Sequence, residues 1–168
     1  MPITIRPAVP EDAGTILDFV RELAAFEREP DAVKATEADL RRDGFGPERR
    51  FEARIAELDG EPVGFTLFFH NYSTWEGRPG LYLEDIYVTE RARRHGVGRR
   101  LLEDLASVAV ARGCARLELS VLDWNPARGF YAALGFSQKP EWLPYRLAGE
   151  ALHRLAEPAG RRRADEVS

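Results

Sequence analysis

Two adjacent carboxylates, Glu84 and Asp85, lie inside an otherwise apolar stretch that runs from Leu81 to Val88. Burying ionised carboxylates is unfavourable unless they are paired or functional. Neighbouring residues on a strand point to opposite faces, so the two need not share one role. Together they could bind a cationic amine and accept its proton, a step that costs roughly 4 to 5 kcal/mol at pH 7 for an amine of pKa near 10.4. A structural ion pair or an exposed strand edge is the alternative.

A basic, glycine-containing turn follows directly and opens an amphipathic stretch. Gly96 and Gly98 would let a phosphate approach the backbone closely, and the free N–H groups of a helix start favour an anion. The sequence has no G-x-x-x-x-G-K-S/T, and the third glycine of a dinucleotide fingerprint is missing. We therefore expect an anion site that is neither a P-loop nor a dinucleotide-binding turn. A plain turn with solvated arginines is the alternative. The nearby cations are Arg93, Arg94, Arg99 and Arg100.

Composition limits the possible partners. The formal net charge of -4 argues against a general nucleic-acid binder and is compatible with a small cationic substrate. The start of the sequence lacks the pattern of a signal peptide, and no apolar run approaches the ~20 residues of a membrane helix, so we expect a soluble, cytoplasmic protein without membrane contact. The histidines, His70, His95 and His153, lack ligand spacing, and we expect no metal.

Hydrophobic periodicity predicts alternating strands and helices. Asp59-Gly60 is a hairpin signal, and Thr36 to Asp39 resembles a capping box. The expected strands are 3–6, 51–57, 63–69, 81–89 and 117–122, with strand-like pieces near Phe136 and at 145–147. The expected helices are 10–29, 36–44, 96–112, 126–134 and 149–156, and residues 70–80 are expected to form a loop.

This order predicts an α/β fold in which helices cover a mixed sheet (α+β). No repeat or linker interrupts the chain, so we expect a single domain over residues 1–157. Residues 158–168, which contain an arginine run, are expected to form a disordered tail.

The sequence Arg93-x-x-Gly96-x-Gly98 resembles the Q/R-x-x-G-x-G/A signature with which the GNAT acetyltransferase superfamily binds the pyrophosphate of acetyl-CoA. A second segment, from Asn125 through Tyr131 to Gly135, resembles the strand end and short helix of the same family. The resemblance covers nearly the whole chain. It implies a GNAT-like fold, with a mixed, mostly antiparallel sheet splayed between strands 4 and 5 and helices on both faces. It also implies acetyl-CoA as cosubstrate.

Tyr72-Ser-Thr-Trp75 and Leu122-Asp-Trp-Asn125 resemble the diamine (spermidine/spermine) acetyltransferase branch, and within it the thialysine acetyltransferases. Polyamine enzymes tend to carry an Asp where this chain has Ser73-Thr74, which favours a small diamino acid such as thialysine, ornithine or lysine. Polyamine acetylation is the alternative substrate class, and a non-catalytic acetyl-CoA-binding regulatory module is the alternative of a different kind. Members of the branch are usually homodimers, which is implied here too.

The resemblance also implies residue roles. Tyr131 would donate a proton to the departing CoA thiolate, and Glu84 would be the base that deprotonates the amine. Between Asn125 and Tyr131 the chain is one residue shorter than the family usually is. A deletion inside the helix would rotate Tyr131 by about 100°, so we expect the gap near Pro126. The implied acetyl-CoA contacts are Ile86, Tyr87, Val88, Arg93, Arg94, His95, Gly96, Val97, Gly98, Arg99, Asn125 and Tyr131. The implied amine contacts are Phe26, Glu27, Trp75, Glu84, Asp85 and Glu141.

Overall fold

The computed structural model describes residues 2–158, and these form two compact units, Met1–Asn125 and Pro126–Ser168. The first holds all the strands of the described residues together with the long helices, and the second holds two short helices. The single domain expected over residues 1–157 stays a prediction. All but the first residue of the expected tail, 158–168, lies outside the described residues.

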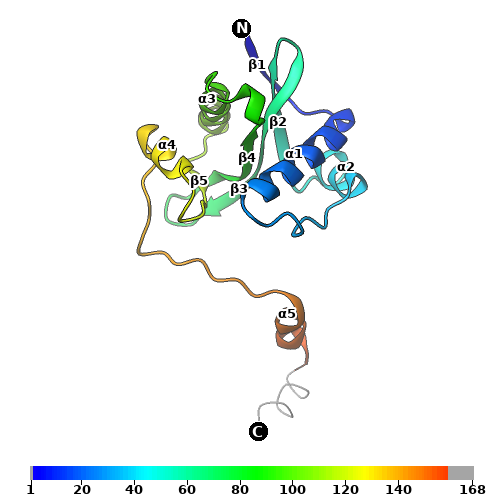
Figure 1. Ribbon diagram of the computed structural model, residues 1–168. Helices are drawn as coiled ribbons and strands as arrows, with labels where there is room; N and C mark the ends of the chain where they lie inside the picture. Colours follow the sequence, from blue (N-terminus) through cyan, green and yellow to red (C-terminus); the bar gives the residue numbers. More distant parts are fainter. Residues whose placement is uncertain (1, 159–168) are drawn as a thin grey trace. The chain divides into compact units, whose positions relative to one another are not determined.

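The strands of the first unit form one sheet in the order β1-β2-β3-β4-β5 (Figure 1). Its first four strands are paired antiparallel, and β5 is parallel to β4. The expected mixed, mostly antiparallel sheet is therefore confirmed. The strands are β1 (Ile3–Pro7), β2 (Glu52–Leu58), β3 (Glu61–Ser73), β4 (Arg78–Val88) and β5 (Leu117–Leu119).

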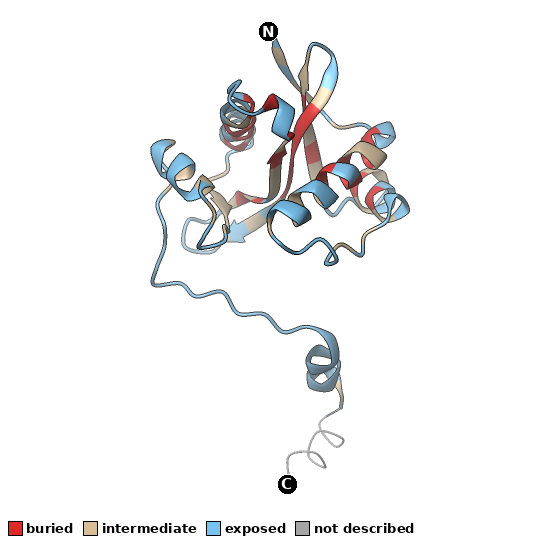
Figure 2. Cartoon of the chain, viewed as in Figure 1, coloured by how far each residue is buried: buried red, intermediate tan, exposed pale blue. Residues whose placement is uncertain are grey.

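Helices cover both faces of this sheet, as expected (Figures 1 and 2). On one face, α1 (Ala13–Phe26) and α2 (Glu37–Phe45) pack on a core that includes Phe65 of β3. On the other, α3 (Val97–Ala111) buries Val97 and Leu101 against the sheet. The buried residues of Figure 2 accordingly line the sheet and the helix faces turned towards it. A short 3-10 turn precedes α1 (η1, Pro10–Asp12), and another precedes α3 (η2, Glu90–Ala92).

Local capping and turn signals are confirmed. Thr36 Oγ1 accepts from the backbone N–H of Asp39 at 3.1 Å, and the Asp39 carboxylate accepts from the Thr36 N–H at 2.9 Å, which is a capping box. Asp59 and Gly60 have φ of 53° and 81°, as the tight hairpin turn between β2 and β3 requires. Gly113, with φ of 71°, ends α3 as predicted.

The loop expected over residues 70–80 is wrong. β3 continues to Ser73 and β4 begins at Arg78, with Tyr72 opposite Pro79, so only a short turn separates them. His70 and Tyr72 are exposed while the residues between and after them are half-buried. This is strand alternation at a solvated sheet end, where polar side chains hide the period that predicts a strand.

Two predicted helix ends also shift. α1 stops at Phe26 rather than Glu29, because Arg28 adopts a left-handed φ of 66°. The N–H of Arg28 donates to Ala25 O at 3.1 Å and that of Glu29 to Ala24 O at 2.9 Å, the pattern of a Schellman motif.

Gly44 does not end its helix, since α2 continues to Phe45. A Cβ on Gly44 would lie 2.6 Å from Cζ of Phe51, so the close packing of that ring explains the glycine. Gly46 follows as the C-terminal cap.

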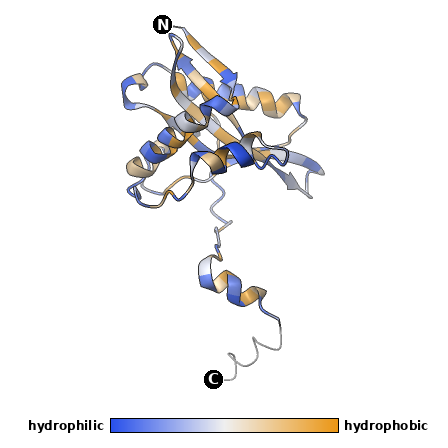
Figure 3. Ribbon diagram, turned by 90° about the vertical axis from the view of Figure 1, so that its right-hand side faces the viewer, coloured by the Kyte–Doolittle hydropathy of each residue, from blue (hydrophilic) through white to orange (hydrophobic). Residues whose placement is uncertain are grey.

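The second unit contains α4 (Ala127–Ala133) and α5 (Gly149–Ala156), close to the predicted ranges. The strand pieces expected near Phe136 and at 145–147 are wrong, because no strand follows β5 within the described residues. A short apolar run needs a neighbouring strand to pair with, and this unit has none up to residue 158. Figure 3 shows polar and apolar residues mixed along α5, whose Leu152 and Leu155 are exposed.

Candidate active site

The second half of β4 has a strand neighbour on one side only. β3 pairs with β4 as far as Val88, but the pairing of β4 with β5 covers only Leu81 to Leu83. From Glu84 to Val88, therefore, one edge of β4 has no strand beside it among the described residues. Such an edge presents backbone N–H and C=O groups to which an extended ligand can add like a further strand.

A β-bulge lies where this edge begins. Leu67 is opposite Asp85 and Phe68 is opposite Leu83, which leaves Glu84 without a partner on β3. Bulges bend a strand and redirect a side chain, and they are frequent next to active sites. Glu84 is exposed and Asp85 is half-buried. The adjacent carboxylates thus have different surroundings.

Glu27, Glu84 and Asp85 form what we call the carboxylate cluster. Burial, and to a smaller extent the negative charges of Glu84 and Glu27, together raise the pKa of Asp85 to about 6. Glu27, the C-terminal cap of α1, also has its pKa raised by burial. A cation bound among these groups would relieve their mutual repulsion and offset their desolvation. The cluster is therefore suited to hold an ammonium group.

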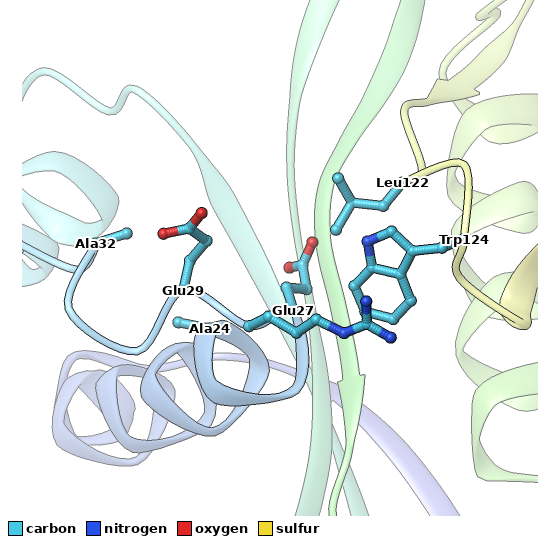
Figure 4. A pocket seen from close by; sticks show the side chains of 7 residues that line it. Ala24, Glu27, Glu29, Ala32, Leu122 and Trp124 are labelled. Carbon is cyan, nitrogen blue, oxygen red and sulfur yellow. The ribbon is translucent and has the colours of Figure 1, made fainter.

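An open pocket of about 440 Å³ adjoins Glu27 (Figure 4). The end of α1 and the residues after it contribute Glu27 and Glu29, and the loop after β5 contributes Leu122 and Trp124 across from them. The Arg28 guanidinium carbon lies 3.8 Å from the centroid of the Trp124 ring. The remaining lining residues are Ala24 and Ala32.

Four residues of this pocket were not predicted as site residues: Arg28, Glu29, Leu122 and Trp124. The local signals were the charged run Glu27-Arg28-Glu29 directly before Pro30 and the segment Leu122-Asp-Trp-Asn125, which had indicated the family branch but no role for its side chains. Phe26, which was predicted, borders the same region, with its ring 6.1 Å from that of Trp124.

The start of α3 has the features expected of an anion site. Gly96 is the N-cap with φ of 80°, and no side chain of the described residues caps the helix. The first N–H groups of the helix thus have no intrahelical partner, and the helix dipole favours a negative charge there. Buried Val97 anchors this turn to the core. Around it Arg94, His95 and Arg99 are exposed, Arg99 with an ion pair to Glu103 at 2.8 Å, and Gly98 is half-buried.

Arg93 lies differently from its neighbours. Its Nε donates to Val88 O at 3.1 Å, and its guanidinium carbon is 5.5 Å from the Phe26 ring centroid and 5.6 Å from that of Tyr87. The side chain therefore runs back along β4 towards α1, rather than towards the start of α3. Arg93 thereby forms a hydrogen bond with the backbone carbonyl of Val88, the last residue of β4.

The other β4 residues alternate between the two faces. Ile86 and Val88 pack with the core under α3. Tyr87 belongs to the core under α1, with its ring 6.1 Å from that of Phe19. These side chains anchor the strand, which leaves its backbone as the part available to a ligand.

Several predicted residues are not gathered at the carboxylate cluster. Trp75 is 80% exposed in the turn before β4. The strand begins at Arg78, after this turn, and Glu84 lies six residues further along it. Roughly 20 Å of extended strand therefore separates the turn that carries Trp75 from Glu84. Asn125 ends the first unit, and its N–H donates to Leu122 O at 3.0 Å.

Tyr131 and Glu141 belong to the second unit. Tyr131 is half-buried, and its ring meets that of Phe136 edge-on at 5.7 Å. Glu141 is exposed, with Oε1 3.8 Å from Lys139 Nζ.

Comparison with known proteins gives consistent results. A sequence model described as the Acetyltransferase (GNAT) family matches residues 17–136. Thialysine N-epsilon-acetyltransferase of Bos taurus is 43% identical over 166 residues, which cover 92% of this chain and 97% of that protein. Spermidine/spermine N(1)-acetyltransferase-like protein 1 of Homo sapiens is 36% identical over 90% of this chain, although the match covers only 23% of that protein.

Solved structures show the same fold. An integron cassette protein from the mobile metagenome of V. cholerae superposes with a TM-score of 0.79 at 25% identity, over 94% of this chain and 99% of that one.

Within residues 2–158, every helix is too short or too polar to cross a membrane.

Proposed function

Because this chain belongs to the GNAT acetyltransferase family, we propose that it transfers the acetyl group of acetyl-CoA to the side-chain amine of a small diamino acid, such as thialysine, ornithine or lysine. The enzyme is an N-acetyltransferase, and acetyl-CoA is the cosubstrate of its family. The observation that carries the choice of a cationic acceptor is the carboxylate cluster, in which the pKa of Asp85 is raised to about 6.

That pKa favours Asp85 as the proton acceptor. Moving a proton from an amine of pKa 10.4 to an ordinary aspartate of pKa 3.9 costs about 9 kcal/mol, and to a carboxylate of pKa near 6 it costs about 6 kcal/mol. Glu84, the base that the family resemblance implies, is exposed at the bulge. We therefore assign proton acceptance to Asp85, and binding of the ammonium group to Glu84 and Glu27.

The first unit also offers a fit for the cosubstrate. The uncapped start of α3 suits a diphosphate, with Gly96, Gly98 and the exposed cations around them as its contacts. The open β4 edge from Ile86 to Val88 suits an extended amide-containing arm, whose amides can pair with the backbone. The family resemblance adds Asn125 as a contact of the cosubstrate and, from the second unit, Tyr131 as the proton donor to the leaving thiolate.

Gly96→Ala should weaken acetyl-CoA binding about 10-fold. The added methyl group meets no protein atom within 4 Å, so it would occupy the space that a phosphate needs. Gly60→Ala is a matched control, since Gly60 has φ of 81° against 80° for Gly96 and equally open surroundings. Both variants should lose similar stability, but only Gly96→Ala should raise the calorimetric Kd for acetyl-CoA. Equal affinities in the two variants would contradict the site.

A thiol-release assay with acetyl-CoA over a panel of amines tests the substrate class. We expect thialysine, ornithine or lysine to give a kcat/KM at least about 10-fold above that of putrescine and spermidine, because an acceptor that matches both the cluster and the pocket has more of its charges paired. A preference for spermidine would favour the polyamine alternative. Acetyl-CoA binding without transfer to any amine would contradict the proposal. The homodimer implied by the resemblance remains a prediction.

A further inference from the structure

We infer that Arg28 binds the α-carboxylate of the acceptor and thereby selects amino acids over simple diamines and polyamines. The inference rests on the proposed function, because it assigns the far end of the acceptor to the pocket beside the carboxylate cluster. Among the described residues that line this pocket, Arg28 is the only cation, and it lies beside the acids Glu27 and Glu29.

The backbone fixes the position of Arg28. Its left-handed φ of 66° and the paired hydrogen bonds of the Schellman motif hold the chain where α1 ends. A non-glycine residue in this conformation is uncommon and is somewhat strained. The strain is retained at a position from which the guanidinium reaches Trp124 on the loop after β5.

The contact with Trp124 orients the guanidinium without using its hydrogen-bonding capacity. The guanidinium carbon lies 3.8 Å from the centroid of the indole ring, close enough for a cation–π contact. A guanidinium held by its face keeps its N–H donors at the edge, in the fork geometry that matches a carboxylate. Within the described part of the chain, Arg28 forms no ion pair or hydrogen bond that would occupy this fork.

The charges around Arg28 match the head of an amino acid. Glu27 and Glu29 precede and follow it in sequence, and both line the same pocket, as Figure 4 shows. Glu29 can receive the α-ammonium group while Arg28 receives the carboxylate, and Glu27 stays with the side-chain ammonium group. Glu27 also interacts electrostatically with Asp85, which connects the pocket to the proton acceptor.

A polyamine would meet the opposite situation. Its second ammonium group would lie beside Arg28, where like charges repel, and the ligand would bring no carboxylate to pair with the guanidinium. The pocket therefore discriminates against a bare diamine by repulsion as well as by a missing hydrogen bond.

The test compares each amino acid with the diamine formed by removing its carboxylate: lysine with cadaverine, and ornithine with putrescine. For Arg28→Met we expect kcat/KM for lysine to fall about 10- to 50-fold, in line with loss of a charge-assisted bidentate contact. The value for cadaverine should stay within about twofold of wild type or rise. Arg28→Lys keeps the positive charge but loses the forked pair of N–H donors. Its kcat/KM for lysine should therefore lie between those of wild type and Arg28→Met.

Arg41→Met is the control, because Arg41 is exposed on α2 with only a surface ion pair to Glu37. This substitution should leave kcat/KM unchanged for both lysine and cadaverine. An equal loss for lysine and cadaverine in Arg28→Met, with Arg28→Lys no better, would overturn the carboxylate role while leaving the proposed function intact. A wild-type enzyme that acetylates none of the four amines would overturn both.

Discussion

Asp85→Asn is expected to lower kcat at pH 7 by about 10²- to 10³-fold, the range that loss of a general base typically produces. Asparagine keeps the size of the side chain but cannot accept the proton of the amine. Binding of acetyl-CoA should be largely retained, because the proposed diphosphate contacts at the start of α3 do not include Asp85. Steady-state thiol release and calorimetric titration would measure the two properties.

The same substitution should stabilise the protein at neutral pH. The pKa of Asp85 is raised from 3.8 to about 6, so its contribution to stability is fully present below pH 3.8 and is lost as the pH rises through about 6. Above that pH the ionised carboxylate opposes folding by about 1 to 3 kcal/mol. Asp85→Asn should therefore have a higher Tm than wild type at pH 7.5, and the difference should vanish near pH 4.

Glu84→Gln is the matched control for this assignment. Because Glu84 is exposed at the bulge, the substitution should reduce kcat/KM for the amine by only about 10-fold. It should raise Tm at pH 7.5 by less than Asp85→Asn does, since it removes only the Glu84 repulsion and not the burial of the Asp85 charge. If Glu84→Gln instead lost more activity than Asp85→Asn, the base would be Glu84, as the family resemblance implies.

Tyr131→Phe should lower kcat by about 10²-fold with little change in the KM of either substrate. A phenol near pKa 10 can protonate a departing thiolate, and phenylalanine cannot. The ring contacts with Phe130 and Phe136 are retained in phenylalanine, so the fold should be preserved. Tyr145→Phe removes a hydroxyl from the same unit at a residue that is 94% exposed, and should have no effect.

This variant also tests the shortened segment between Asn125 and Tyr131. The helix α4 begins at Ala127 with Pro126 as its N-cap, and the position of the gap near Pro126 stays a prediction. An unchanged kcat in Tyr131→Phe would mean that this segment does not present the phenol to the thiol.

Signals confined to a few residues predicted the fold well. The capping box at Thr36, the turn at Asp59-Gly60 and the glycine after α3 each act through their own backbone, so their outcome is set locally. The β3 extension to Ser73 was missed because cross-strand pairing, rather than apolar alternation, stabilises it.

The chemical environment of the site depends on contacts that sequence cannot supply. Glu84 and Asp85 were identified as a pair, but the bulge that exposes one and half-buries the other arises from the register of Leu67 and Phe68 on β3. Arg28 and Trp124 are nearly a hundred positions apart and meet only through the folded sheet. Their pairing has no local pattern by which it could have been predicted.

The most direct measurement follows the acetyl group itself. Incubation with acetyl-CoA labelled with ¹³C at the acetyl carbonyl, together with thialysine, should give one labelled product whose amide NMR signal correlates with the side-chain methylene protons. Label on the α-nitrogen, on the protein, or only in free acetate would contradict an enzyme that acetylates the side-chain amine through its β4 carboxylates.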